Sequence, residues 1–312
     1  RGQSLRDDDI RVLGDMIPSW TNLQVFDLSG NAFGVAGLEQ LPLNDMHCLK
    51  VLNLSRNDFD HAGIQCLARK LAVMRGLEEL YLGRCSIGDQ GAEMLSESLG
   101  NLGNLKVLEM QDNKIGAGGA AALAPALGNM TQLQTLDLRS NQIGAQGAAA
   151  LAPALGKMTQ LQTLNLWENQ IGAEGAAALA SAIGNLTQLQ TLHLNGNKIG
   201  DQGAAALAPA LGNMTQLRKL NLRENQIGAE GAAALAPALG KMTQLQQLNL
   251  YDNEIGVDGA VALAAALCNM TQLWTLDLDS NWIRDEGAAA LAPALGKMTC
   301  LQQLNLYDNE IG

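Results

Sequence analysis

Apolar and polar positions follow one short pattern along the chain, in which three leucines are spaced by polar residues and an asparagine closes the unit. Residues 161–169 show it in full, with Leu161, Leu164 and Leu166 as the leucines and Asn169 as the closing residue. Successive copies lie 26 residues apart once and 28 residues apart every later time. The closing position is occupied by Asn31, Asn57, Cys85, Asn113, Asn141, Asn169, Asn197, Asn225, Asn253, Asn281 and Asn309. A fixed period in this range indicates a protein built of stacked repeats.

Each repeat predicts one strand and one helix. The half that contains leucine-x-leucine alternates apolar and polar positions, which is typical of a half-buried strand. The other half reads Gly-Ala-Ala-Ala-Leu-Ala-Pro-Ala-Leu-Gly and recurs without change from Gly119, Gly147, Gly203, Gly231 and Gly287. Its alanines favour a short helix, and its glycines are expected to bound that helix in loop and C-terminal conformations.

The repeated order of strand, turn and helix predicts an α/β fold with a parallel sheet. Paired strands lie about 4.8 Å apart, whereas helices are about 10 Å wide. The stack is therefore expected to curve into a right-handed α/β horseshoe, with strands on the concave face and helices on the convex face. The closing asparagine is expected to be buried, because its amide can donate to and accept from the backbone of neighbouring turns.

The repeat predicts a single domain over residues 1–312, although this length alone would favour two domains. Residues 1–22 resemble the second half of a repeat, and Asp7, Asp8 and Asp9 favour the start of its helix, where carboxylates stabilise the helix dipole. Ile10 and Ile17 take apolar helix positions of this partial repeat. Residues 23–312 hold about eleven strand-containing repeats, the last of them truncated. Gly312 comes just after a strand, with no polar cap behind it. Either the natural protein continues or this end packs against another molecule, and end-to-end self-association through an uncapped C-terminus is the expectation in the second case.

The motif Leu-x-x-Leu-x-Leu-x-x-Asn-x-Ile-Gly, followed by an alanine-rich helix, identifies the chain as a leucine-rich-repeat protein. It resembles the ribonuclease-inhibitor class, and its pattern is most similar to the C-terminal repeat domains of NOD-like receptors. That resemblance implies a horseshoe that binds macromolecules on its concave face. It also implies membership of a group that includes intracellular immune sensors, a ribonuclease inhibitor and a GTPase-activating protein.

The composition and charge of the chain limit the kinds of partner that it is expected to bind. The net charge of −11 disfavours nucleic acid and favours a protein or peptide with a basic surface. No run of eighteen apolar residues occurs, so no membrane span is expected. The cysteines are odd in number and scattered over separate repeats, which favours a reducing, cytoplasmic location. They are Cys48, Cys66, Cys85, Cys268 and Cys300.

Comparison of the repeats with one another points to a binding surface. The leucines and helices hardly change, whereas the two positions before the closing residue carry every chemical class. Two residues before it stand Ser29, Ser55, Gly83, Gln111, Arg139, Trp167, Asn195, Arg223, Tyr251, Asp279 and Tyr307. One residue before it stand Gly30, Arg56, Arg84, Asp112, Ser140, Glu168, Gly196, Glu224, Asp252, Ser280 and Asp308. Recognition of a ligand explains this variation, and neutral drift at exposed sites is the alternative.

Aromatic residues favour recognition over drift. Six of the chain's few aromatics are expected to be exposed at or beside strands, where tyrosine and tryptophan commonly anchor interfaces. They are Tyr81, Trp167, Tyr251, Trp274, Trp282 and Tyr307. The last three repeats also carry many carboxylates, so an acidic and aromatic patch is expected there. The candidate ligand-binding residues of the concave face are Arg139, Trp167, Glu168, His193, Arg223, Tyr251, Asp252, Trp274, Asp277, Asp279, Trp282, Tyr307 and Asp308.

Catalytic chemistry is not expected. His47, His61 and His193 lie in different repeats, and none has a second histidine or a cysteine at metal-ligand spacing. His193 is expected on the concave face between Asn165 and Asn221, in a row of polar strand residues. No phosphate-binding loop with a Gly-Lys-Ser motif occurs. The sequence therefore predicts neither a catalytic site, nor a metal, nor a cofactor.

The pattern favours a protein-interaction module, most simply the ligand-recognition or regulatory domain of an intracellular, innate-immune-receptor-like protein. Three alternatives stay open, and one of them is a purely structural role in assembly, in which the C-terminal end of the stack forms dimers. A secreted recognition protein similar to the lamprey variable receptors would use glycosylation sequons, which occur at Asn53, Asn129, Asn185, Asn213 and Asn269. A regulator of an enzyme would act as a ribonuclease inhibitor or as a GTPase activator, for which Arg139 and Arg223 are the candidate arginines.

Overall fold

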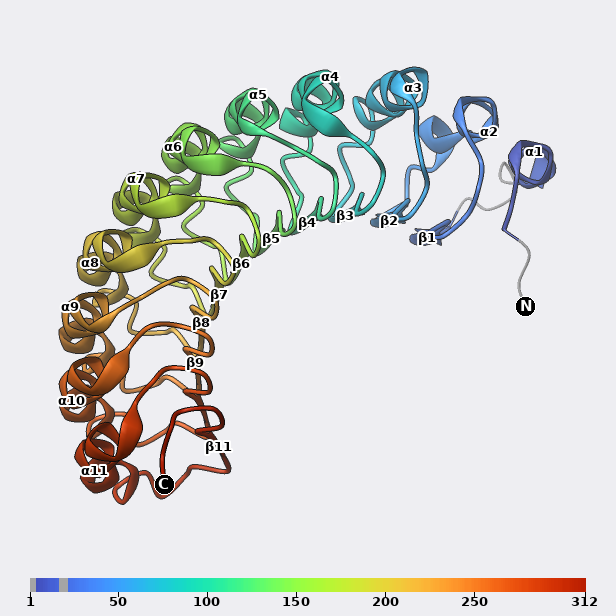
Figure 1. The fold of residues 1–312 in the computed structure, drawn as a ribbon. Helices are drawn as coiled ribbons and strands as arrows, with labels where there is room; N and C mark the ends of the chain where they lie inside the picture. The colour runs from blue at the N-terminus through green and yellow to red at the C-terminus, as the bar shows by residue number, and fades with distance from the viewer. Residues whose placement is uncertain (1–3, 17–21) are drawn as a thin grey trace.

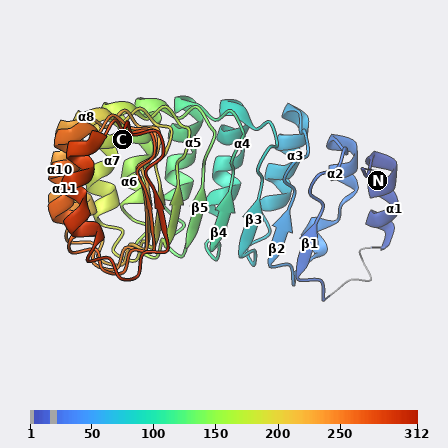
Figure 2. The same ribbon diagram turned by 60° about the horizontal axis from the view of Figure 1, so that its bottom comes forward.

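The computed structural model describes residues 4–16 and 22–312 and shows an arch (Figure 1). Eleven parallel strands form one sheet in the order of the chain and line the concave face. The helices form a second layer on the convex face, behind the strands (Figure 2). The predicted α/β solenoid is thus confirmed. The expected apolar position at Ile17 lies outside the described residues.

The elements alternate along the chain. The strands are β1 (Val25–Asp27), β2 (Val51–Asn53), β3 (Glu79–Tyr81), β4 (Val107–Glu109), β5 (Thr135–Asp137), β6 (Thr163–Asn165), β7 (Thr191–His193), β8 (Lys219–Asn221), β9 (Gln247–Asn249), β10 (Thr275–Asp277) and β11 (Gln303–Asn305). The helices are α1 (Asp7–Met16), α2 (Val35–Gln40), the 3-10 helix η2 (Leu43–Asp45), α3 (His61–Leu71), α4 (Gly88–Gly100), α5 (Ala117–Leu127), α6 (Gly144–Leu155), α7 (Gly172–Gly184), α8 (Gly200–Leu211), α9 (Ala229–Leu239), α10 (Gly256–Leu267) and α11 (Arg284–Leu295).

Each strand is three residues long, and β1 to β10 bury their central residue, whereas Leu304 at the centre of β11 is 42% exposed. In β6, Leu164 is fully buried and pairs in register with Leu192 of β7, while Thr163 on its flank stays half-buried. Successive side chains of a strand point to opposite faces. The central leucines therefore face the helices, and the residues on either side of them form the concave surface.

A glycine near the start of most helices sets the distance between neighbouring helices. A Cβ on Gly175 of α7 would lie 2.7 Å from the Ile171 side chain and 3.0 Å from the Cα of Ala145 in α6. Only glycine permits this approach. The sequence-based expectation that the repeated glycines bound the helices was partly wrong, because Gly147 lies inside α6. The glycine at the other end, Gly156, has right-handed helical geometry and so does not need its conformational freedom.

The closing asparagines form the predicted ladder beneath the turns. The Asn197 amide nitrogen donates to the carbonyls of Leu166 and Leu194 at 2.8 and 2.9 Å. Its Oδ1 accepts from the backbone N–H groups of Asn169 at 2.9 Å and Ile171 at 3.3 Å. Asn197 is fully buried. One side chain thus satisfies backbone groups of two consecutive repeats, as buried polar groups require.

Cys85 replaces the asparagine in one repeat and is fully buried, as expected of a structural thiol. Its Sγ donates to the carbonyl of Leu54 at 3.3 Å, so it keeps one contact with the preceding repeat. Burial raises the pKa of this thiol to about 12. All five cysteines are free thiols in the structure.

Aspartates near the start of some helices cap the helix of the next repeat. Asp201 of α8 accepts from the N–H groups of Gly228 at 2.7 Å and Gly231 at 2.9 Å, at the start of α9. Asp7 of α1 makes the same pair of bonds to α2. The acidic run at the N-terminus therefore does more than the predicted stabilisation of its own helix dipole.

Removing one ladder amide tests how strongly this contact holds the stack. Asn197→Ala leaves backbone N–H and carbonyl groups of two repeats buried without partners, so the free energy of unfolding should fall by about 2–4 kcal/mol. Asn213→Lys is the matched control, because Lys157 and Lys241 occupy the same exposed position in other repeats. Urea denaturation followed by circular dichroism measures both variants. Equal stability of Asn197→Ala and the control would contradict the proposed role of the ladder.

Candidate binding surface

The concave surface consists of three rows of side chains that run across the sheet. Counted back from the closing residue, the rows lie at the sixth, fourth and second positions, and each strand contributes one residue to each row. In β8 and the residues that follow it these are Lys219, Asn221 and Arg223. The second-position row is the one whose variability is visible in the sequence, and of the other two rows only His193 and Asp277, both at the fourth position, were predicted to bind a ligand.

The fourth-position row organises the ends of the strands. Its asparagines and aspartates accept from the N–H group two residues later, for example Asn221 from Arg223 at 3.0 Å and Asn249 from Tyr251 at 2.9 Å. These bonds turn the chain out of the strand. They also fix the position from which the second-position side chains extend.

At the C-terminal end of the concave face, Arg223 and Tyr251 form a stacked pair. The Arg223 guanidinium lies 4.4 Å from the centre of the Tyr251 ring, and its Nε donates to Glu224 at 2.9 Å. Tyr251 is half-buried beneath this arginine. Tyr307, two repeats further on, is 76% exposed and is thus the more accessible aromatic of the row.

Between these tyrosines lie two partly buried carboxylates. Asp277 accepts from the Asn249 amide at 3.1 Å, and Asp279 accepts from the Asn305 amide at 3.1 Å. Burial, together with the charge of Asp279, raises the pKa of Asp277, although the hydrogen bond from the Asp279 N–H opposes this shift. Asp279 is only 9% exposed, which corrects the expectation of an open position. We call Arg223, Tyr251, Asp277, Asp279 and Tyr307 the C-terminal patch.

The central strands carry a cationic region. Arg139 lies 3.6 Å from the carboxylate of Asp137, which is nearly buried. His193 pairs in register with Asn165 and Asn221, as predicted. Burial lowers the pKa of His193, and the nearby charges of Lys219 and Arg139 lower it further. His193 is therefore held mainly neutral at pH 7 within a polar row.

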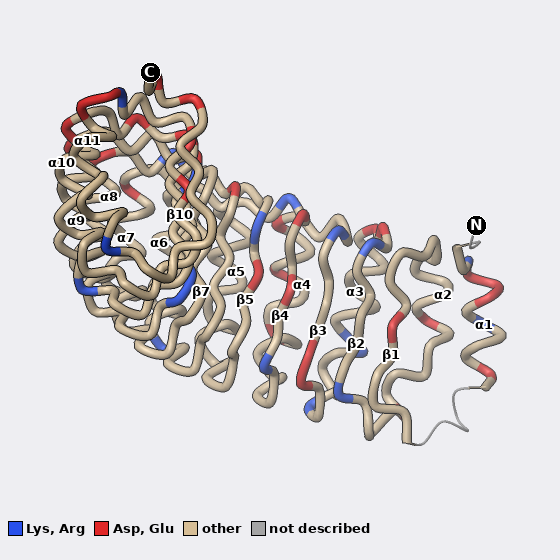
Figure 3. Tube along the Cα trace, turned by 90° about the horizontal axis from the view of Figure 1, so that it is seen from below, with Lys and Arg blue, Asp and Glu red and all other residues tan. Residues whose placement is uncertain are grey.

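The N-terminal half holds an acidic cluster that the sequence analysis did not identify. The Tyr81 hydroxyl donates to Glu79 at 2.7 Å, and the Gln111 amide donates to Glu109 at 3.2 Å. Burial raises the pKa of Glu109, and the charge of Asp137 adds to this effect. The acidic residues of β3 and β4 are visible in Figure 3. The signal in the sequence was Glu109 and Asp137 at the fourth position of adjacent repeats, with Glu79 at the sixth position of the repeat before them, and pairing of the strands brings the three together.

Trp274 lies apart from the two tyrosines of the C-terminal patch. It precedes β10, five positions before Asp279, and is 37% exposed. Five extended residues span about 16 Å. Trp274 is therefore at the opposite end of the strand, and the expected single patch of aromatics is corrected to two separate groups. Exposure was also overestimated for Tyr81, Trp167 and Tyr251, which are all half-buried.

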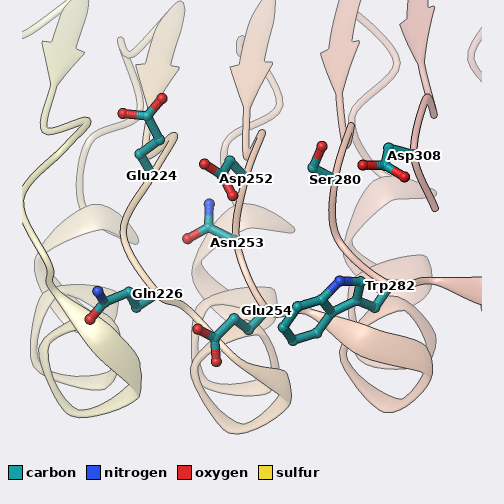
Figure 4. A pocket seen from close by; sticks show the side chains of 8 residues that line it. All are labelled: Glu224, Gln226, Asp252, Asn253, Glu254, Ser280, Trp282 and Asp308. Carbon is teal, nitrogen blue, oxygen red and sulfur yellow. The ribbon is translucent and has the colours of Figure 1, made fainter.

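Besides Trp274, which stands seven positions before Asn281, four further candidate residues lie outside the three concave rows. Glu168, Asp252, Trp282 and Asp308 occupy the turns that follow the strands, and all four have positive φ angles of 48–55°. Their assignment to the concave face is therefore corrected, because the alternation of a strand ends before them. They line two grooves along the edge of the sheet, one of which is shown in Figure 4.

The chain belongs to the leucine-rich-repeat family. A family model described as a leucine-rich repeat region matches residues 152–312, and a second, described as a leucine-rich repeat, matches five segments between residues 21 and 152. Leucine-rich repeats are typically interaction modules that present a curved surface to another protein, and they generally have no catalytic role. The class of protein is thereby established.

A solved structure shares the fold. An internalin (InlF) from Listeria monocytogenes is 22% identical, with a TM-score of 0.57, and the match covers 98% of this chain and 89% of that one. A leucine-rich-repeat protein of Leptospira interrogans is 18% identical with a TM-score of 0.49, covering 100% and 91% of the two chains. At 22% identity, the similarity to the internalin is evidence for the fold of this chain and not for its function. No curated protein matches the chain significantly.

Within residues 4–16 and 22–312, no group of three or more histidine, cysteine, aspartate or glutamate side chains is arranged to hold a metal ion. In the same part of the chain, no helix is long and apolar enough to cross a membrane.

Asp277 offers a test of the cost of a buried charge in the C-terminal patch. Its raised pKa means that ionisation is less favourable in the folded than in the unfolded protein, so folded wild type should lose stability as the pH rises above about 3.8. Asp277→Asn removes this loss, and asparagine already fits the same row at Asn249 and Asn305. The melting temperature of the variant should therefore exceed that of wild type at pH 7, and the difference between the two melting temperatures should be smaller near pH 3.5. A lower melting temperature at pH 7 would contradict this account.

Proposed function

We propose that this protein binds a basic protein or peptide through the concave face of its last four repeats, with the C-terminal patch as the centre of contact. The observation that carries the proposal is the placement of Asp277 and Asp279 between Tyr251 and Tyr307 on an otherwise repetitive surface. Aromatic side chains supply contact area and carboxylates supply selectivity for cations.

The energetics of the patch support a basic partner. The raised pKa of Asp277 shows that its charge is held at a cost in the free protein. A cationic group of the partner would offset that cost when it binds beside Asp277. Arg223 already stacks on Tyr251. An arginine of the partner could make the same kind of cation–π contact with a tyrosine of the patch.

The biological role that we infer is ligand recognition or regulation within an intracellular, innate-immune-receptor-like protein. The support is the similarity of the repeat to the NOD-like receptor pattern, together with five free thiols, which suit a reducing compartment. Regulation of an enzyme by the same face, as in ribonuclease inhibitors, would use the same acidic chemistry. Self-association through the β11 edge stays a prediction that analytical ultracentrifugation can test.

Substitution of the two tyrosines tests the proposal. Immobilised protein should enrich lysine- and arginine-containing members of a displayed random peptide library. For the best enriched peptide, Tyr251→Ala and Tyr307→Ala should each raise Kd about 10-fold, equivalent to about 1.4 kcal/mol of lost binding free energy. Isothermal titration calorimetry measures the affinity.

Val261→Ala is the matched control, because Val261 is an exposed apolar residue on the convex helix α10. It should leave Kd unchanged. Trp274→Ala should weaken binding less than either tyrosine substitution, since Trp274 lies at the other end of the strands. Enrichment of acidic peptides, or equal affinity of the tyrosine variants and the control, would contradict the proposal.

A further inference from the structure

A groove along the carboxyl ends of the last strands is a second candidate binding surface, and its lining differs from the concave face. It encloses about 460 Å³ between two rows of side chains (Figure 4). One row, in the residues directly after the strands, is Glu224, Asp252, Ser280 and Asp308. The other, nearer the helices, is Gln226, Glu254 and Trp282, and the buried Asn253 lies between the two rows. We call this cavity the edge groove.

The edge groove carries unneutralised negative charge. Within the described chain, no lysine, arginine or histidine side chain forms an ion pair with Asp252, Glu254 or Asp308. Some other carboxylates of these two rows are paired, as Asp112 is with Arg84 at 3.1 Å and as Glu224 of the groove itself is with Arg223. A cleft lined by one sign of charge concentrates ions of the opposite sign. The edge groove therefore favours a cation.

Trp282 lines one side of the groove with an aromatic ring, and the turn in which it lies can form without a tryptophan. It is 55% exposed and has a φ of 55°, a conformation that is uncommon for bulky residues. Gln170 and Gln226 adopt the same φ region at the same position of other repeats. A polar residue thus suffices for the fold, whereas the indole face can hold a guanidinium or an ammonium group.

A second groove, nearer the N-terminus, has a similar volume but a different lining, so shape alone does not define the binding site proposed for the edge groove. It has about 480 Å³ and is built from the same two rows. Its charged lining is mixed, with Lys114 opposing Asp112 and Glu168, and it has no aromatic residue. The backbone geometry therefore repeats along the arch, while the combination of unpaired carboxylates and tryptophan belongs to the edge groove.

The spacing of the repeats suits an extended peptide. Consecutive repeats are separated by about 5 Å at the strands and about 10 Å at the helices, and the edge groove lies between these layers. Alternate side chains of an extended segment are about 7 Å apart. Basic residues at every second position can therefore meet Asp252 and Glu254 in one repeat, Trp282 in the next and Asp308 in the one after it.

We propose that the edge groove binds an extended segment with lysine or arginine at alternate positions, with Trp282 stacked on one of the cations. This proposal shares one premise with the proposed function, which is that the partner is basic. It assigns a different surface, so either proposal can fail alone.

A fluorescein-labelled octapeptide of alternating lysine and serine is the probe, and its fluorescence anisotropy measures binding to the whole protein. Asp252→Asn, Glu254→Gln and Asp308→Asn combined should weaken binding at least 10-fold. Trp282→Gln should weaken it several-fold and abolish quenching of the indole fluorescence by the peptide. An alternating glutamate and serine peptide should not bind.

The control removes equal charge from the convex side. Glu97→Gln, Glu174→Gln and Glu230→Gln combined have the same net charge as the groove variant, and all three residues are exposed on helices α4, α7 and α9. This variant should bind the lysine peptide within 2-fold of wild type. Equal weakening of both triple variants would show attraction to overall charge and overturn the proposal, as would full affinity of the groove variant. Tyr251→Ala should retain the lysine peptide, which separates failure here from failure of the concave site.

Discussion

The structure depends on a hydrogen-bonded amide that recurs beneath every turn except the one where Cys85 takes its place. An asparagine such as Asn225 donates to carbonyls of its own and the preceding repeat, and accepts from N–H groups of the preceding repeat. These backbone groups are buried, and without the amide each would cost about 1–3 kcal/mol. The amide therefore fixes how one repeat sits on the next. Parallel pairing of short strands and close packing of helices follow from that fixed geometry.

A rigid frame lets functional side chains vary at little cost to the fold. The central leucines and closing asparagines carry the stability of the stack, so residues on the concave rows and in the turns can change chemistry from repeat to repeat. The frame also accommodates unfavourable charges. Asp277 is held partly buried with a raised pKa. In the edge groove Glu224 pairs with Arg223, whereas Asp252, Glu254 and Asp308 form no ion pair in the described chain. Both features are consistent with surfaces completed by a partner.

The sequence predicted the fold well because the repeat makes each position visible eleven times. Leu164 and Asn169 could be assigned to the core and the ladder from spacing alone. The site was predicted less well, because the positions directly after a strand are not distinguished by the pattern. Asp252 and Trp282 were assigned to the concave face, yet a left-handed turn directs the chain away from it. Glu109 was missed since its burial arises from residues of neighbouring repeats.

The sequence by itself determined the repeat, the parallel sheet, the curvature and the acidic, aromatic character of the C-terminal repeats. These properties follow from periodicity and residue type, which act within one repeat or between adjacent copies. Only the tertiary structure decided which variable side chains share a surface. It separated Trp274 from Tyr251 and Tyr307, and it brought Asp252, Glu254 and Trp282 into one groove. The physical reason is that strand direction and turn conformation set where a side chain points, and the motif specifies neither for its variable positions.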